Sequence, residues 1–518
     1  MKRNQLRGIV AAVSGTLLFG FAHMAMADSS DDLLKKLHDK GVLSDEEYDQ
    51  FNAQRDSEKV KKSSEIKASF KDGISWQSSD GATKMSVSGR IQTDYRSFSD
   101  VPTQSSNSNT ADTWDIRRAY LGAKGTFYNS INWELTTDLA AKTDANSSNN
   151  ANNNNGYIKY GWLEAAWWEQ AKLRFGQFKS PFGLEQNTSS RFIDFTERDW
   201  GASLAPGVDR GMMLHGVPVK GMYYAVSAMN GAYLADYGQN NIEPNNNYQG
   251  KEYDGRLAVN FAQLSNIQDM ILHAGVDYGK ATNLPSINGA TNQGGTSGPN
   301  TLSFRTNGRG TQFFTTTGTY LNPDIQREGL EGIVAYKQFK FQTEGYQFKL
   351  EPGSGLPGPS AGSQDKKIKT WYADVAWLIT GENYSDAYKD GLMDRIRPKN
   401  DFIAPGAPGI GAWEVAARYS KFDAKDFSSC NGNAAACGST NGLASTAVDY
   451  NYANSSNDVH SWSAGLKWIP NPNTRFMLDY IDTKFDHAIT GNNSQNNGTT
   501  VAPYDTEKAI NLRAQIDF

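Results

Sequence analysis

The residues of this chain whose type and spacing could do chemistry are arginines that alternate with apolar residues. Arg90 and Arg96 are out of phase with Val87, Ile91 and Tyr95, so they would project from the polar face of a strand. A guanidinium group stays charged and offers a planar fork of donors, which suits phosphate and other anions. The same alternation selects Arg118, Arg174, Arg256, Arg418, Arg475 and Arg513. The pattern predicts a set of cations on one face of a sheet that could guide small anions.

A second interpretation of these arginines stays open. Acids occupy the same polar face by the same alternation: Glu134, Asp138, Glu164, Asp254, Glu344 and Glu414. Arginines and acids that share one face could pair with each other and only satisfy a polar wall. The sequence predicts that some of the arginines set the electrostatic field of a path, without assigning each one.

Enzyme and cofactor chemistry have little support. The chain has no HExxH, GxSxG or phosphate-loop motif. The histidines after the first 27 residues are scattered and are expected to be wall or surface residues: His38, His215, His273, His460 and His487. The net charge of −5 argues against a nucleic-acid partner. We expect no catalytic residues, no metal and no cofactor.

The composition restricts the elements that can carry these arginines. The chain has 518 residues, of which 38% are hydrophobic, and its mean hydropathy is −0.61. A bundle of membrane helices is excluded, because it needs several apolar runs of about 20 residues. Disorder is disfavoured because 12% of the residues are aromatic. A large aqueous-looking β protein remains, or a barrel whose apolar residues are hidden by alternation.

Residues 1–27 have the pattern of a secretory signal peptide. Three basic residues precede a short apolar stretch, which ends before the small residues Ala25 and Ala27. A membrane anchor is disfavoured because the stretch is too short to span a bilayer comfortably. Cleavage after Ala27 would remove three basic residues and no acid, and would change the net charge from −5 to −8.

Residues 28–64 differ from the rest and are predicted to form a periplasmic helical hairpin. Leu33, Leu34 and Leu37 share one helical face, and Gly41 ends that helix. The run from Ser44 to Glu47 is a capping box that opens a second helix. The apolar stripe is too short to be stable alone, so we expect it to self-associate or to pack on something.

The two cysteines, Cys430 and Cys437, lie in a polar Gly/Ala/Ser/Asn stretch. Export permits a disulfide between them, as a staple within one exposed loop. A metal site is disfavoured because no histidine is near and neither cysteine belongs to a CxxC pair.

From residue 65 to residue 518 the apolar period becomes 2, which is typical of strands with one apolar face. Seventeen candidate strands follow: 84–98, 114–127, 130–139, 157–168, 171–178, 210–217, 221–229, 252–261, 271–279, 301–314, 328–337, 338–349, 369–380, 412–420, 459–469, 474–485 and 509–518. A bacterial outer-membrane barrel has an even number, so we expect sixteen. Segments 210–217 and 301–314 are the weakest candidates.

Soluble β-sandwiches and propellers also alternate, but three features favour a membrane barrel. The polar face is charged along whole strands, which a sandwich core does not tolerate unpaired. Aromatic residues such as Tyr128 and Trp168 sit near strand ends, as in interfacial girdles. The last strand is amphipathic and ends in Phe518. Long Asn/Ser/Gly-rich linkers alternate with tight turns, as a meander across a bilayer requires.

Five segments resemble the phosphate-selective porin O and P family. They are Asp115–Gly122 (DIRRAYLG), Arg174–Glu185 (RFGQFKSPFGLE), Trp371–Leu378 with Thr380–Glu382, Gly411–Ser420 (GAWEVAARYS) and Gly465–Asn473 (GLKWIPNPN). The second and fourth segments together are specific. The resemblance implies an all-β fold: a 16-stranded antiparallel transmembrane β-barrel in the cell outer membrane, assembled as a homotrimer among membrane lipid. It also implies an inward-folded third loop and a ladder of arginines and lysines that guides anions.

The third loop implied by the resemblance runs from about Ser180 to Asp209. It contributes Arg191 and Arg198 as candidate pore residues, but acids outnumber cations in it. A phosphate-selective constriction should be richer in cations. The acids could instead anchor the loop to wall arginines and leave Arg191 or Arg198 facing the pore.

Three functions follow from these observations. The first is a passive, water-filled channel for small anions such as phosphate or polyphosphate. The second is a general or differently selective diffusion porin. The third is a non-conducting surface receptor or adhesion barrel, which the long Asn-rich loops would serve.

Overall fold

The computed structural model describes most of the chain after residue 34. The described residues are 35–63, 66–69, 74–101, 112–140, 157–231, 250–282, 284, 302–316, 323–351, 365–406, 408–427, 450, 452–490 and 502–518. Cys430 and Cys437, like the predicted signal peptide, lie outside them.

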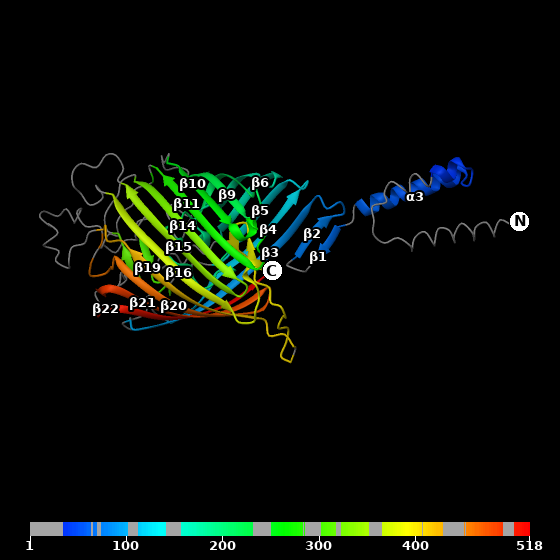
Figure 1. The fold of residues 1–518 in the computed structure, drawn as a ribbon. Coiled ribbons are helices and arrows are strands. Elements are labelled where there is room, and N and C mark those ends of the chain that lie inside the picture. Colours follow the sequence, from blue (N-terminus) through cyan, green and yellow to red (C-terminus); the bar gives the residue numbers. More distant parts are fainter. Residues whose placement is uncertain are drawn as a thin grey trace. The chain divides into compact units, whose positions relative to one another are not determined.

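Sixteen antiparallel strands of the described chain form a closed barrel, as the alternation predicted (Figure 1). They are β3 (Lys84–Ser99), β4 (Thr113–Phe127), β5 (Ile131–Asp138), β6 (Tyr157–Trp168), β7 (Ala171–Lys179), β8 (Val208–Gly216), β9 (Met222–Met229), β10 (Glu252–Asn260), β11 (Met270–Ala281), β14 (Asp324–Tyr336), β15 (Phe339–Glu351), β16 (Lys366–Leu378), β19 (Ala412–Asp423), β20 (Asp458–Asn471), β21 (Thr474–Ile489) and β22 (Tyr504–Asp517). Each strand pairs with its neighbour in the chain, and β22 pairs with β3.

The last residue completes the closure of the barrel. The backbone N–H groups of Gly89 and Phe518 donate to each other's carbonyl oxygens, at 2.9 and 3.1 Å. A Cβ atom at position 89 would lie 2.3 Å from the Phe518 ring, so this close approach requires glycine.

The distribution of burial is the inverse of that in a soluble protein. In β16, Tyr372 and Asp374 point inward and are buried, whereas Trp371 and Val375 point outward and are exposed. The inward side chains of the other strands include many buried charged and polar residues, and the outward side chains include exposed apolar residues. An apolar outer surface around a polar interior is the pattern of a barrel that spans a bilayer. No helix within the described residues is long and apolar enough to cross a membrane.

Exposed aromatic side chains gather where the tight turns join the strands. Tyr128 and Trp168 lie beside the turns after β4 and β6. Near other strand ends on this side, aromatic rings stack in pairs: Phe339 with Trp377 and Trp413 with Trp468, at ring-centre separations of 5.8 and 5.5 Å. This is the arrangement expected of an interfacial girdle.

The prediction that 301–314 is a barrel strand was wrong. This segment forms a separate two-stranded hairpin, β12 (Ser303–Arg305) with β13 (Gln312–Thr315). Phe313 and Phe314 are adjacent, yet both are fully buried in an aromatic cluster with Trp200 and Phe422. A strand with lipid on one side alternates, whereas this hairpin is covered on both faces. The other weak candidate, 210–217, corresponds to β8.

The connection from β16 to β19, residues 379–411, lies on the tight-turn side but is long. It contains the short helix η1 (Tyr384–Ala387) and the strand pair β17 (Tyr388–Lys389) and β18 (Leu392–Met393). Its apolar side chains pack with Leu184 and with inward residues of β11 and β14. This connection therefore fills part of the lumen from the turn side.

The N-terminal residues form a compact unit of their own. Residues 35–39 are helical, Gly41 follows with a φ of +65°, and helix α3 spans Asp45–Ser63. The predicted capping box is confirmed: Ser44 Oγ accepts from the Glu47 N–H at 3.2 Å, and the Glu47 carboxylate accepts from the Ser44 N–H at 3.1 Å. Two short strands follow in the chain, β1 (Ile66–Ser69) and β2 (Ile74–Ser78), and β2 pairs with β3.

Candidate functional site

The connection between β7 and β8, residues 180–207, is the third long connection on its side and is called the third loop below. It contains two one-turn helices, α4 (Leu184–Asn187) and α5 (Trp200–Leu204). Wall carboxylates bind its backbone: Glu344 accepts from the N–H groups of Leu184 and Glu185 at 2.7 and 2.9 Å. Asp277 accepts from the Gly183 N–H at 3.0 Å. The third loop therefore lies against inward-facing side chains of β11 and β15.

Acids of the third loop also pair with wall cations. Asp194 lies 2.5 Å from the Lys340 ammonium of β15 and 3.6 Å from that of Lys467 in β20. Glu185 lies 2.7 Å from the Arg418 guanidinium in β19. These acids of the third loop thus anchor it to cations of the barrel wall, which is the role that the sequence left open for them.

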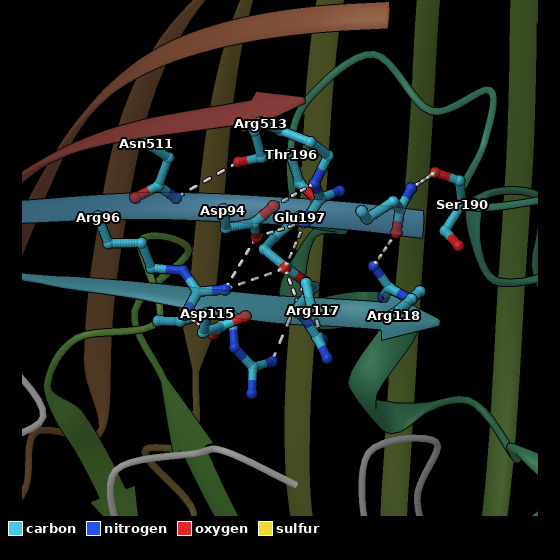
Figure 2. A network of polar contacts seen from close by, with 12 residues as sticks. Asp94, Arg96, Asp115, Arg117, Arg118, Ser190, Thr196, Glu197, Asn511 and Arg513 are labelled. Atoms are coloured by element: carbon cyan, nitrogen blue, oxygen red, sulfur yellow. Dashed lines mark hydrogen bonds and ion pairs between the residues drawn. The ribbon is translucent and has the colours of Figure 1, made fainter. Parts of the chain in front are cut away.

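Glu197 lies in a network of charged side chains that joins the third loop to the barrel wall (Figure 2). Its two oxygens accept from Nε and Nη2 of Arg117 at 2.7 and 3.2 Å, and one of them from Arg513 at 3.1 Å. Arg96 and Arg309 lie 3.9 and 4.0 Å away. One loop carboxylate therefore joins strands β3, β4 and β22 to the β12–β13 hairpin.

A cavity of about 830 Å³ lies between the third loop and strands β3–β9. Eleven cationic side chains line this cavity: Arg90, Arg117, Arg118, Lys124, Lys159, Arg174, Lys179, Arg191, Arg198, Arg309 and Arg395. Its acidic lining residues are four: Asp115, Glu134, Asp138 and Asp394. Cationic side chains thus outnumber acidic ones in the lining of this cavity, although the whole chain has more acids than bases.

Arg90 and Arg118 are held by neutral groups. Arg90 donates to Ser190 Oγ at 2.8 Å, and its guanidinium lies 4.2 Å from the Tyr120 ring centre. The Nε of Arg90 has no hydrogen-bond acceptor among the described residues. Arg118 donates to the side-chain oxygen of Gln92 at 2.9 Å. Neither guanidinium is within ion-pair distance of a described carboxylate, so both keep their charge available to the cavity.

The other predicted cavity residues differ in how they are held. Arg198 donates to the backbone oxygens of Glu185 and Thr188, each at 2.7 Å. The side chain of Arg191 is 24% exposed and lies 3.6 Å from Asp517. Arg174 is paired with Glu164 at 2.6 Å and lies over the Trp162 ring.

The remaining five predicted arginines line neither this cavity nor the smaller one described below. Four are in buried ion pairs: Arg96 with Asp94 and Asp115, Arg256 with Glu331, Arg418 with Glu185 and Asp374, and Arg513 with Asp94 and Glu197. Arg475 is buried 5.0 Å from the Phe192 ring. The structure places these five in the wall.

Sequence reasoning missed several cations of the cavity. It favoured Arg118 over Arg117, but a bulge opposite Gln92 and Thr93 breaks the alternation, and both line the cavity. Lys124 continues the phase of Arg118 along β4, so the signal was present and unused. Arg309 was hidden because its segment was assigned to the barrel wall.

A second cavity of about 240 Å³ lies between the third loop and the β12–β13 hairpin. Arg118, Arg198 and Arg309 line both cavities, so the two adjoin. Arg305 and Glu197 line only the smaller one. Within the described residues no group of His, Cys, Asp or Glu side chains is placed to hold a metal ion.

The charges of the third loop are set by their partners. Burial alone would raise the pKa of Glu197, but Arg117 and Arg309 outweigh it and hold that pKa well below the ordinary range. Burial of Asp199 dominates and raises its pKa to about 6, although Arg418 acts against it. Glu197 is therefore a fixed negative charge near neutral pH.

Comparison with known proteins adds the family to this geometry. Porin O of Pseudomonas aeruginosa is 26% identical over 440 residues, which cover 83% of this chain and 89% of that protein. Solved structures with a similar chain fold include OmpT of Vibrio cholerae and the outer membrane channel DcaP of Acinetobacter baumannii. Each is 11% identical and covers 84% of this chain and 98% of its own, with TM-scores of 0.46 and 0.45. The model of the phosphate-selective porin O and P family matches residues 85–518, so the chain belongs to that family and is a porin of the Gram-negative outer membrane.

Proposed function

We propose that the barrel is a passive, water-filled channel for small anions, inorganic phosphate among them. The observation that carries this proposal is the lining of the larger cavity, where eleven cationic side chains face four acids. Rings and ladders of Arg and Lys are how anion pores select. The full sequence is acidic overall, with a net charge of −5, so the cationic lining is a local arrangement rather than a reflection of net charge.

The proposed route passes both cavities. Arg305 and Arg309 of the hairpin stand at the smaller cavity, and Arg118 and Arg198 belong to both. Arg90 and Lys179 line the larger cavity beyond them, and Lys124 lies toward the turn end of β4. Successive cations of this kind replace part of the hydration of an anion at each step.

We place the phosphate-binding site beside Arg90, Arg118 and Arg198. Ser190 lies beside Arg90, so a hydroxyl donor accompanies the guanidinium groups there. Arg forks bind phosphate oxygens with two parallel hydrogen bonds, which lysine cannot do. The third loop would narrow the route at this level, because Ser190 and Arg198 belong to it.

Phosphate block of chloride current tests this assignment. Arg90→Gln should raise the half-blocking phosphate concentration about tenfold, the usual effect of losing one charge-assisted contact of about 1.4 kcal/mol. Arg210→Gln is the matched control. It removes the same charge from an exposed residue in phase with the outward Met212 and Leu214. Chloride current without phosphate block would favour a general porin, and an assembled barrel without conductance would favour the receptor alternative.

We also propose that the channel is a homotrimer and that residues 28–64 act in the periplasm as an oligomerisation element. Support comes from the family resemblance and from the helices found at 35–39 and in α3. The signal peptide at 1–27 and the Cys430–Cys437 disulfide remain predictions from the sequence.

A further inference from the structure

Glu197 has an unusual position for a residue beside an anion path. It lines the smaller cavity together with Arg118, Arg198 and Arg309. It is also the carboxylate that lies within 4.0 Å of four guanidinium groups, those of Arg96, Arg117, Arg309 and Arg513. A negative charge here lies where a permeating anion would otherwise meet these cations.

The contact with Arg117 has the geometry of anion recognition. Nε and Nη2 of Arg117 donate to the two oxygens of Glu197 at 2.7 and 3.2 Å. This two-pronged arrangement is the one that a guanidinium offers to a carboxylate or to a phosphate. The side chain of Glu197 is 9% exposed, so the site is partly reached by solvent.

We propose that Glu197 is a fixed internal anion that determines how tightly the pore holds phosphate: it occupies the Arg117 fork and weakens the binding of anions at the adjoining Arg118 and Arg198. This inference rests on the proposed function of an anion channel. It assigns to an acid of the third loop a role in specificity, beyond its role as an anchor.

The physical reason is the requirement for release. A conducting site must bind its ion well enough to admit it and weakly enough to let it leave. Arg96, Arg117, Arg118, Arg309 and Arg513 together would form a deep trap for a multivalent anion. Asp94, Asp115 and Glu197 offset part of that charge, and of these only Glu197 belongs to the loop. Because Arg117 and Arg309 keep the pKa of Glu197 low, this compensation persists near neutral pH.

The test is Glu197→Gln in the full-length, reconstituted protein, with inorganic phosphate added against a chloride current. The half-blocking phosphate concentration should fall about two- to thirtyfold. This is the range expected from removing the repulsion between two unit charges about 8 Å apart, for effective dielectric constants of about 80 and about 20. The largest phosphate flux should fall as well, because phosphate leaves more slowly. Glu197→Asp keeps the charge and should stay within about twofold of the original protein.

A matched control separates charge from anchoring. Asp194→Asn removes another buried acid of the same loop, paired with Lys340 and Lys467, but Asp194 lines neither cavity. It should lower thermal stability while changing the half-blocking concentration less than Glu197→Gln does. If Glu197→Gln does not assemble, Asp115→Asn removes a neighbouring charge from β4 and should also lower the half-blocking concentration.

The inference is overturned if Glu197→Gln leaves phosphate block unchanged or weakens it, or if Asp194→Asn strengthens block equally. Loss of anion preference in the original protein would overturn the proposed function itself. An anion-preferring original protein with an unresponsive Glu197→Gln would overturn only this inference.

Discussion

At the scale of single residues, the inward arginines fall into two groups that share one sequence pattern. Arg256 and Arg418 are fully buried and contact carboxylates. Arg90 and Arg118 contact neutral groups beside a cavity. Alternation predicts that all four point inward, but it cannot give the partner, because Arg418 and Glu185 are 233 positions apart. The partners lie on other strands or on the third loop, Glu331 for Arg256 and Asp374 and Glu185 for Arg418, so the fold decides which guanidinium is paired.

The paired group should matter for stability rather than for selectivity. Arg256 donates to both oxygens of Glu331 at 2.7 Å and to the backbone oxygen of Gly391 at 2.8 Å. Arg256→Met leaves Glu331 buried without its main partner and should destabilise the barrel by about 3–5 kcal/mol. Urea unfolding in detergent measures this cost. A stable Arg256→Met barrel with altered ion selectivity would contradict the division into two groups.

At the scale of elements, the third loop depends on charges that act in opposite directions with pH. Burial alone would raise the pKa of Asp194, but Lys340 and Lys467 outweigh it and lower that pKa, as Arg117 and Arg309 do for Glu197. Their contribution to docking of the loop is fully present above the ordinary values of 3.8 and 4.5 and is lost as pH falls below them. Asp199 has a raised pKa of about 6, so its ionisation opposes docking as pH rises from 3.8 through about 6.

Only strong acidification should loosen the third loop. Protonation of Asp199 favours docking as pH falls from about 6 to 3.8, whereas the contribution of the two anchoring acids is lost as pH falls from 4.5 through their lowered pKa values. We therefore expect single-channel conductance to rise only below about pH 3, as the loop leaves the route. The double variant Asp194→Asn/Glu197→Gln has already lost both anchors and should show a smaller rise. Equal conductance at about pH 4 and about pH 2 in the original protein would count against this account of the loop.

At the scale of the whole molecule, the sequence predicted the barrel wall better than the segments that lie inside its lumen. Lipid contact on one side enforces a period of 2, which is visible in single strands such as β16. Segments inside the lumen have no such constraint, so the β12–β13 hairpin was taken for a strand and residues 379–411 were not foreseen as a filling segment. The family resemblance predicted the third loop, whereas the ion pairs of its acids are visible only in the structure.

Assembly of the whole molecule can be examined through its N-terminal segment. Deleting residues 28–62 should lower the melting temperature of the proposed trimer on semi-native gels, because the segment is proposed to join the copies. The barrel of one copy closes without it, so each monomer should still fold. Unchanged trimer melting would argue against this role.

The central claim is that the cations of the larger cavity face a conducting path. Its most direct test is the reversal potential of the original protein in a planar bilayer under a tenfold KCl gradient. We expect a reversal potential whose sign and size are set by chloride. It should shift clearly toward zero when Arg90 and Arg118 are both changed to Gln. A reversal potential set by potassium would contradict it.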